Sequence, residues 1–198
     1  MVTVGEAAWE ARLRRTLAGD GARPALVLVE GRAGTGKTRL LRALAASGEP
    51  PAAHVWWTCG GGGPVPEVPA GGTVLLLVDD VHLAGGQEAA WLRGLLEEPR
   101  PGLAAALAYR PEEVAEPGLP LGAPPVRYPA ELVVLRHRVE PWTRDQVRQA
   151  ATEALGEDSS PEAVDRLHER SGGVAQVVVD VLTALRGAGP RRCTAADV

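Results

Sequence analysis

The sequence predicts an α/β protein with a five-stranded parallel sheet flanked by helices and a small helical lid at its C-terminal end. Two observations favour this fold. Short apolar runs alternate with helical stretches up to about residue 140 of 198, as expected when each strand is joined to the next by a crossover. Residues 141–198 contain successive helical segments instead. We therefore expect an α/β core at residues 1–140 and a helical lid at residues 141–198, with no room for a third domain.

The first strand is expected at residues 25–30, where ALVLVE has the length and apolar character of a buried strand. A helix is expected to precede it over residues 6–18, because apolar residues recur there at every fourth position. Another helix is expected to follow over residues 38–47, with its leucines on one side. Strand, loop and helix thus follow one another at the start of the core.

The residues between this strand and this helix match a phosphate-binding loop. The pattern G-x-x-x-x-G-K-[ST] is met by Gly31, Gly36, Lys37 and Thr38. In such loops the backbone N–H groups and the helix N-terminus bind phosphate. We expect the lysine to reach the β- and γ-phosphates and the threonine hydroxyl to ligate Mg²⁺. The other loop residues predicted to bind the nucleotide are Ala33, Gly34, Thr35 and Arg39.

Lys37 is the only lysine among 21 lysine and arginine residues. In a chain so biased toward arginine, lysine is expected to persist where a slim ammonium is needed and a planar guanidinium does not fit. The composition therefore supports a specific role for this residue.

Further strands are expected over residues 52–59, 73–80, 102–110 and 131–140, and a helix over residues 87–97. The alanine-rich segment 102–110 has a helical propensity. It is nevertheless short, lies between two prolines, and falls where the alternating pattern requires a strand. The expected core is thus a parallel P-loop NTPase sheet.

Charged residues follow two of these strands. Asp79 is predicted to hold the metal and Asp80 to orient or activate the attacking water. The alternative is that both acids only cap the next helix. Arg110 ends a later strand and is predicted to lie beside the γ-phosphate, the alternative being an ordinary surface arginine. His82 is interpreted as structural.

The lid is expected to contain three helices. The first opens with a capping box formed by Thr143 and Gln146. The second has Ser160 as its N-cap and Gly172 as its C-terminal stop. The third is expected over residues 174–186.

The order of these features resembles the nucleotide-binding domain of the STAND class of AAA-type P-loop ATPases, particularly that of the large ATP-binding regulators of the LuxR family. The likeness is carried by VEGRAGTGKTRLL, LLLVDDVHLA, AYRPEE, HRVEPWTRDQVRQ and LHERSGGVAQVVVDVL. It implies a sheet in which the sensor strand lies between the phosphate-loop strand and the acid strand. It also implies ATP with Mg²⁺, slow hydrolysis, and use of the nucleotide as a conformational switch rather than as a motor. The Walker A lysine falls on Lys37, the Walker B acids on Asp79 and Asp80, and the sensor arginine on Arg110.

The sequence departs from this family at three points. It reads VGEAAWE where the family usually has GRE, and Ala175 stands where the lid usually has a proline. Both positions normally help to hold the adenine. The winged helix, repeat region and helix-turn-helix of the family do not fit within 198 residues. An excised domain and a minimal stand-alone ATPase are both consistent with this length.

The composition of the chain limits the kinds of partner that we expect it to bind. The net charge of −4 does not favour direct nucleic-acid binding. Cys59 and Cys193 form neither a metal cluster nor a short redox pair, and no long apolar segment or signal peptide is evident, so we expect a cytoplasmic protein without membrane contact. The expected partners are the nucleotide and, through the lid, a second copy or another protein.

Two other functions also begin with a phosphate-binding loop. A nucleotide-dependent interaction module would bind ATP or ADP without turnover and act by changing partners. A small-molecule phosphotransferase would need an arginine-rich lid over the donor phosphates. The proline-rich acidic segment PEEVAEPGLPLGAPP does not supply one, so this function ranks last.

Overall fold

The computed structural model describes residues 11–13, 15–17, 23–46, 53–114, 121, 126–156 and 159–187. These residues fall into two units. The larger contains the sheet and the helices that cover it, and the smaller contains the last three helices together with the loop residues Ala33–Gly36. None of the helices in the described ranges is both long enough and apolar enough to cross a membrane.

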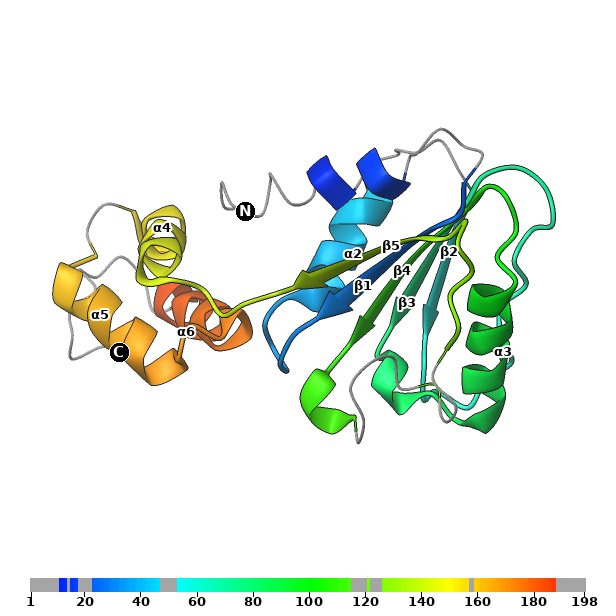
Figure 1. Cartoon of the computed structure of the whole chain (residues 1–198). Coiled ribbons are helices and arrows are strands. Elements are labelled where there is room, and N and C mark those ends of the chain that lie inside the picture. Colours follow the sequence, from blue (N-terminus) through cyan, green and yellow to red (C-terminus); the bar gives the residue numbers. More distant parts are fainter. Residues whose placement is uncertain are drawn as a thin grey trace. The chain divides into compact units, whose positions relative to one another are not determined.

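The larger unit is built on a five-stranded parallel sheet (Figure 1). Its strands are β1 (Ala25–Glu30), β2 (Ala53–Thr58), β3 (Val74–Asp79), β4 (Leu103–Tyr109) and β5 (Val133–Arg138). They lie in the order β2-β3-β4-β1-β5, and every neighbouring pair is parallel. The expected fold class is therefore confirmed, and β4 lies between the phosphate-loop strand and the acid strand, as the resemblance implied.

The three central strands are buried almost throughout, which explains their continuous apolar sequences. The alanine-rich segment forms β4 because strands on both sides of it supply its hydrogen bonds, and this overrides its helical propensity. The edge strands β2 and β5 instead alternate between exposed and partly buried residues.

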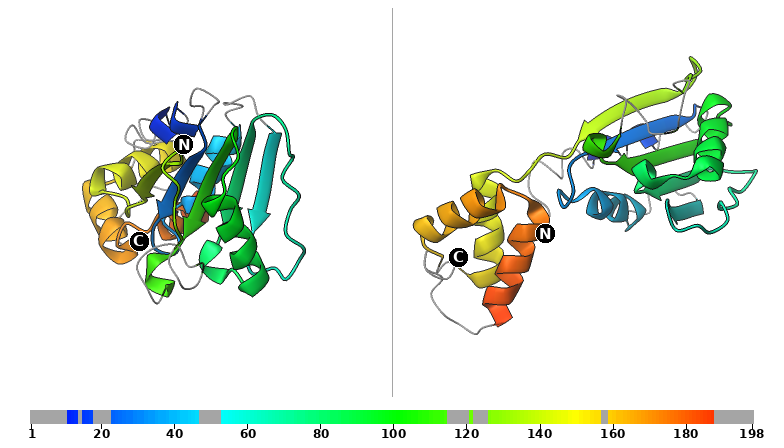
Figure 2. Two further views of the ribbon diagram at one scale, coloured as in Figure 1. Left: turned by 45° about the vertical axis from the view of Figure 1, so that its right-hand side comes forward. Right: turned by 90° about the horizontal axis from the view of Figure 1, so that it is seen from below.

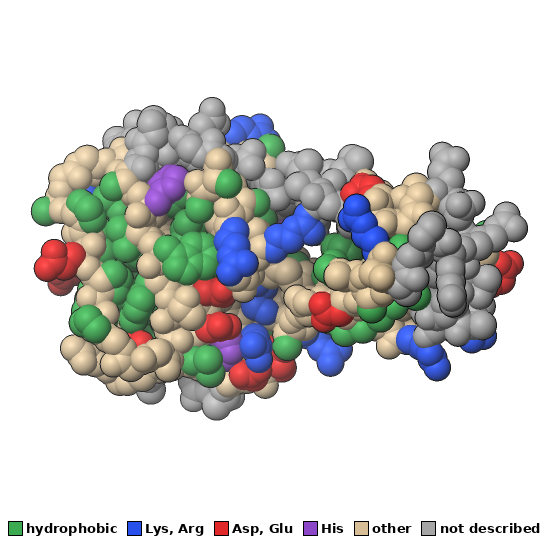
Figure 3. All heavy atoms as spheres, turned by 180° about the vertical axis from the view of Figure 1, so that it is seen from behind, with side chains coloured by type: hydrophobic (Ala, Val, Ile, Leu, Met, Phe, Trp, Pro, Cys, Tyr) green, Lys and Arg blue, Asp and Glu red, His purple; other side chains and the backbone are tan. Residues whose placement is uncertain are grey.

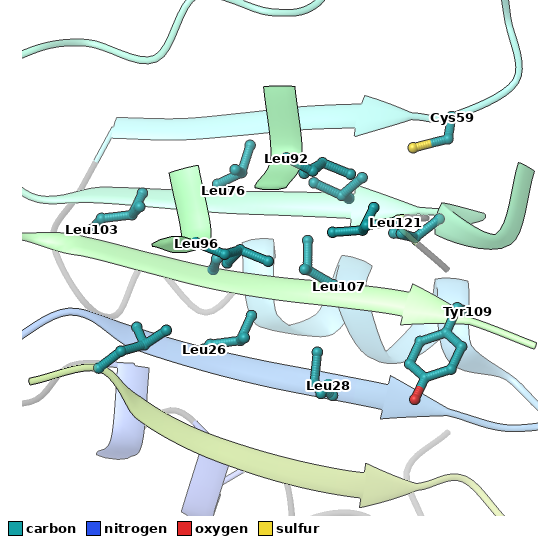
Figure 4. Packing of buried hydrophobic residues seen from close by; sticks show 14 residues of the cluster. Leu26, Leu28, Cys59, Leu76, Leu92, Leu96, Leu103, Leu107, Tyr109 and Leu121 are labelled. Carbon is teal, nitrogen blue, oxygen red and sulfur yellow. The ribbon is translucent and has the colours of Figure 1, made fainter. Parts of the chain in front are cut away.

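Helices α2 (Lys37–Ala46) and α3 (Gly86–Glu97) cover opposite faces of the sheet (Figure 2). Leu92 and Leu96 of α3 pack on one face, where Cys59 is also buried (Figure 4). Leu41 of α2 packs on the other face. Each fully buried leucine stabilises the fold by about 1.5–3 kcal/mol. Burial also raises the pKa of the Cys59 thiol to about 12, so this thiol stays protonated and unreactive.

A helical segment also precedes β1. Residues 11–13 and 15–17 are helical, and Leu13 and Leu17 are buried in the same cluster as α2. The remainder of the helix predicted over residues 6–18 lies outside the described residues. The VGEAAWE segment and Cys193 also lie outside them.

The smaller unit contains three helices, and the first two begin at the predicted capping residues. The Thr143 hydroxyl accepts a hydrogen bond from the Gln146 N–H, and the Gln146 side chain accepts one from the Thr143 N–H. The Ser160 hydroxyl accepts one from the Ala163 N–H, and Gly172 ends its helix in a left-handed conformation. The helices are α4 (Arg144–Leu155), α5 (Pro161–Ser171) and α6 (Ala175–Gly187).

Trp142 lies at the centre of this helical unit. It is buried among Val147, Leu167 and Val178, and its backbone N–H donates to the Gly173 carbonyl at 2.7 Å. A side chain at Gly173 would collide with the Trp142 carbonyl oxygen, and the positive φ of 71° at that residue also favours glycine. Gly173, the second glycine of the segment Ser171-Gly172-Gly173, therefore allows the Trp142 backbone to approach closely.

Candidate nucleotide site

The loop that carries the phosphate-binding motif leaves β1 at the carboxyl edge of the sheet. Gly34 and Gly36 have φ values of 72° and 108°, which side chains other than glycine rarely adopt. Helix α2 begins at Lys37, one residue before the predicted start, so the last loop residues adjoin its N-terminus. A helix N-terminus after a glycine-rich loop is suited to binding anions.

Lys37 is buried at the base of this loop. Its ammonium group donates to the carbonyl oxygens of Gly31 at 2.7 Å and Arg32 at 2.9 Å. Burial lowers the pKa of Lys37, and the positive charge of Arg110 lowers it further, whereas nearby carboxylates oppose the shift. An ammonium group that binds carbonyl oxygens in a buried position can bind phosphate oxygens there in the same way.

Thr38 and Asp79 meet directly although they lie 41 residues apart in the sequence. The Thr38 hydroxyl donates to Asp79 Oδ2 at 2.6 Å, and the Asp79 carboxylate is nearly buried at the end of β3. Oxygen ligands of this kind suit Mg²⁺, which commonly takes one or two protein ligands and completes its octahedron with phosphates and water. No group of three His, Cys, Asp or Glu side chains that could hold a metal occurs in the described part of the chain.

Asp80 marks an abrupt change of direction after β3. Among the described residues it is the only one other than glycine with a positive φ, at 51°. Aspartate tolerates this left-handed conformation better than most residues. Asp80 precedes a 3₁₀ turn, η1 (Val81–Leu83), and its side chain makes no capping hydrogen bond to the described residues of that turn. The capping alternative therefore has no support at Asp80, whose side chain is 31% exposed.

Arg110 follows β4 and begins a second 3₁₀ turn, η2 (Pro111–Glu113). Its guanidinium donates to Glu113 Oε1 at 2.6 Å, and this bond raises the pKa of Arg110. The Arg110 side chain is one-third exposed. Glu113 was not predicted as a site residue, although a proline after the arginine and an acid three residues on are sequence signals of such a turn.

A second group of residues that the sequence analysis missed lies directly before the loop. Tyr109 Oη donates to Glu30 Oε1 at 2.5 Å, and Arg136 Nη1 donates to the same oxygen at 3.0 Å. Burial and the bond to Glu30 raise the pKa of Tyr109. Tyr109 and Glu30 are the last residues of β4 and β1, whereas Arg136 lies within β5, two residues before its end. Tyr109 is visible at the end of β4 in Figure 4. Tyr109 and Arg136 together hold the side chain of Glu30, the residue that precedes Gly31.

The structure thus brings Lys37, Thr38, Asp79, Asp80 and Arg110 to one edge of the larger unit. Acidic and basic side chains gather there in the view from behind (Figure 3). Of the other predicted residues, Gly31 and Thr35 are buried and Gly36 is partly buried. The exposed ones are Ala33, Gly34 and Arg39. The carboxyl edge of a parallel sheet is where ligands of open α/β folds bind.

No family model and no curated protein matches the sequence. Solved structures do match the fold. A RuvB variant from Thermotoga maritima aligns with a TM-score of 0.62 at 14% identity, over 94% of this chain and 62% of that one. The T. maritima RuvB Holliday junction branch migration motor aligns with a TM-score of 0.63 at 15% identity, over 98% and 67%. The chain has the fold of a P-loop NTPase.

A third match widens the comparison. A DNA polymerase III gamma subunit-related protein from T. maritima aligns with a TM-score of 0.53 at 16% identity, over 92% of this chain and 58% of that one. RuvB and this protein are both AAA+ P-loop ATPases. The chain spans less than two thirds of the first RuvB structure, and identities this low establish the fold alone.

Proposed function

We propose that this chain is an ATP-binding, slowly hydrolysing switch of the STAND type, with residues 1–140 as the nucleotide-binding core and residues 141–198 as its lid. The observation that carries the proposal is the pairing of a buried Lys37 ammonium with the adjacent Thr38–Asp79 hydrogen bond. These are the two groups that a Mg²⁺-bound phosphate chain requires. A link to transcriptional regulators of the LuxR family rests on the sequence resemblance.

Phosphate binding is assigned to the loop and the start of α2. Lys37 would exchange its two carbonyl acceptors for phosphate oxygens, which are better partners because they are charged. Thr38 and Asp79 would hold Mg²⁺, which supplies the positive charge that neutralises the phosphates. The exposed Arg39 adds a further positive charge in the first turn of α2.

Asp80 is proposed to orient the attacking water and to accept its proton. The left-handed backbone carries its side chain out of the line of the strand, and its partial exposure leaves it accessible to water. Asp79 is buried and bonded to Thr38, so it is suited to the metal and not to the water. The two neighbouring acids therefore take different roles.

Arg110 is proposed to detect the γ-phosphate. A guanidinium can bind a phosphate through two parallel hydrogen bonds. The proposal is supported by the positive charge of Arg110, which lowers the pKa of Lys37 after the larger effect of burial. ADP lacks the γ-phosphate, so this contact is available to ATP alone. A ligand shifts a conformational equilibrium only by its different affinities for the two states.

Arg110→Ala tests this proposal. We expect the variant to lose affinity for ATP by about 1–3 kcal/mol, the usual size of such coupling, while its affinity for ADP changes little. Calorimetric titration of wild type and variant with each nucleotide, in the presence of Mg²⁺, measures both quantities. A variant that prefers ATP over ADP by the wild-type margin would show that Arg110 is an ordinary surface arginine.

A further inference from the structure

The guanidinium of Arg110 is already engaged by a carboxylate of its own turn. Arg110 Nη1 and Glu113 Oε1 are 2.6 Å apart, and the Glu113 N–H donates to the Arg110 carbonyl at 3.2 Å. Pro111 fixes the backbone at the first position of this turn. The ion pair is thus built into a short and conformationally restricted segment.

A buried histidine contacts the other oxygen of the same carboxylate. His82 Nε2 lies 3.3 Å from Glu113 Oε2 and 3.9 Å from Asp80 Oδ1. The His82 side chain has no exposed surface, and neither ring nitrogen has a hydrogen bond with the described residues. Nε2 of the imidazole therefore faces the carboxylates of both Asp80 and Glu113.

We infer that Glu113 is a specificity-determining residue of the nucleotide site, because it competes with a γ-phosphate for Arg110 and so sets the preference for ATP over ADP. The inference rests on the proposed role of Arg110. ATP would have to displace Glu113 from the guanidinium, whereas ADP leaves the ion pair intact. Glu113 thereby weakens the binding of ATP without affecting that of ADP.

The partial exposure of the pair makes this exchange feasible. The side chains of Arg110 and Glu113 are 33% and 41% exposed, and ion pairs in contact with water are weak. A phosphate carries more charge than a carboxylate and presents more acceptor oxygens. The exchange therefore replaces one ion pair that is in contact with water by another.

Glu113→Gln removes the competing charge and keeps the shape of the side chain. We expect ATP affinity to rise by about two- to fivefold, corresponding to the strength of an exposed ion pair, and ADP affinity to stay at the wild-type value. Glu112→Gln is the matched control, because it removes the same charge from the same turn and leaves the Arg110–Glu113 pair in place. It should leave the preference for ATP over ADP at the wild-type value.

The double variant Arg110→Ala/Glu113→Gln tests whether Glu113 acts through Arg110. Its affinity for ATP should equal that of Arg110→Ala alone, because no guanidinium remains to compete for. If Arg110→Ala abolishes the preference for ATP but Glu113→Gln leaves that preference unchanged or lowers it, the inference is wrong and the role of Arg110 stands. An equal rise in preference with Glu112→Gln would also overturn the inference. If Arg110→Ala has no effect on the preference for ATP over ADP, the proposed role of Arg110 is wrong, and the inference about Glu113 falls with it.

Discussion

Replacing Lys37 with alanine is expected to lower the affinity for ATP by about 10- to 150-fold, the effect of losing one hydrogen bond to a charged group. Lys37→Arg should also weaken binding substantially. The ammonium occupies a buried place beside two carbonyl oxygens, and a planar guanidinium is bulkier and directs its donors differently. Calorimetric titration with ATP and Mg²⁺ measures both variants.

Arg42→Ala is the matched control for these two variants. Arg42 lies on the exposed side of α2, so its removal deletes a positive charge from the same helix without touching the buried ammonium. Its affinity for ATP should remain close to that of wild type. A Lys37→Arg protein that binds ATP as tightly as wild type would contradict the argument that this position requires lysine.

The second large effect is expected at Asp80. Asp80→Asn should lower steady-state phosphate release by about 10²- to 10⁴-fold, the range typical of a lost general base, while ATP binding stays nearly intact. Asparagine also tolerates the left-handed backbone found at this residue, so the substitution changes the chemistry and preserves the turn. Phosphate release under saturating ATP and Mg²⁺ is the measurement.

Asp79→Asn provides the contrast. It removes charge from the carboxylate that accepts the Thr38 hydroxyl, so it should weaken Mg²⁺-dependent nucleotide binding. Equal losses of binding in the two variants, or full turnover in Asp80→Asn, would refute the division of roles. If the wild type releases phosphate no faster than Lys37→Ala does, the result would favour the non-hydrolysing interaction module.

Much of the fold follows from local sequence signals. The buried runs that became β1 and β3 are continuous and apolar, and the glycines of the phosphate loop recur at a fixed spacing. The alanine-rich segment could be assigned as β4 only from its place in the alternating pattern. Local capping signals also located the start of α4 and both ends of α5.

The contacts around the site depend on residues that are distant in sequence. Glu30 binds Tyr109 and Arg136, which are 79 and 106 residues away, and only the strand order brings them together. The left-handed conformation of Asp80 has no distinct sequence signal, because aspartate is common in many turns. The contact of His82 with Glu113 likewise requires two separate turns to meet.

Calorimetric titration of the wild-type chain with ATP and with ADP, each in the presence and absence of Mg²⁺, tests the central claim most directly. We expect one nucleotide to bind per chain, Mg²⁺ to strengthen binding, and the affinities for ATP and ADP to differ by about 5- to 150-fold, as a switch requires. A chain that binds neither nucleotide, or that binds both with the same affinity whether or not Mg²⁺ is present, would contradict the proposal of a nucleotide switch.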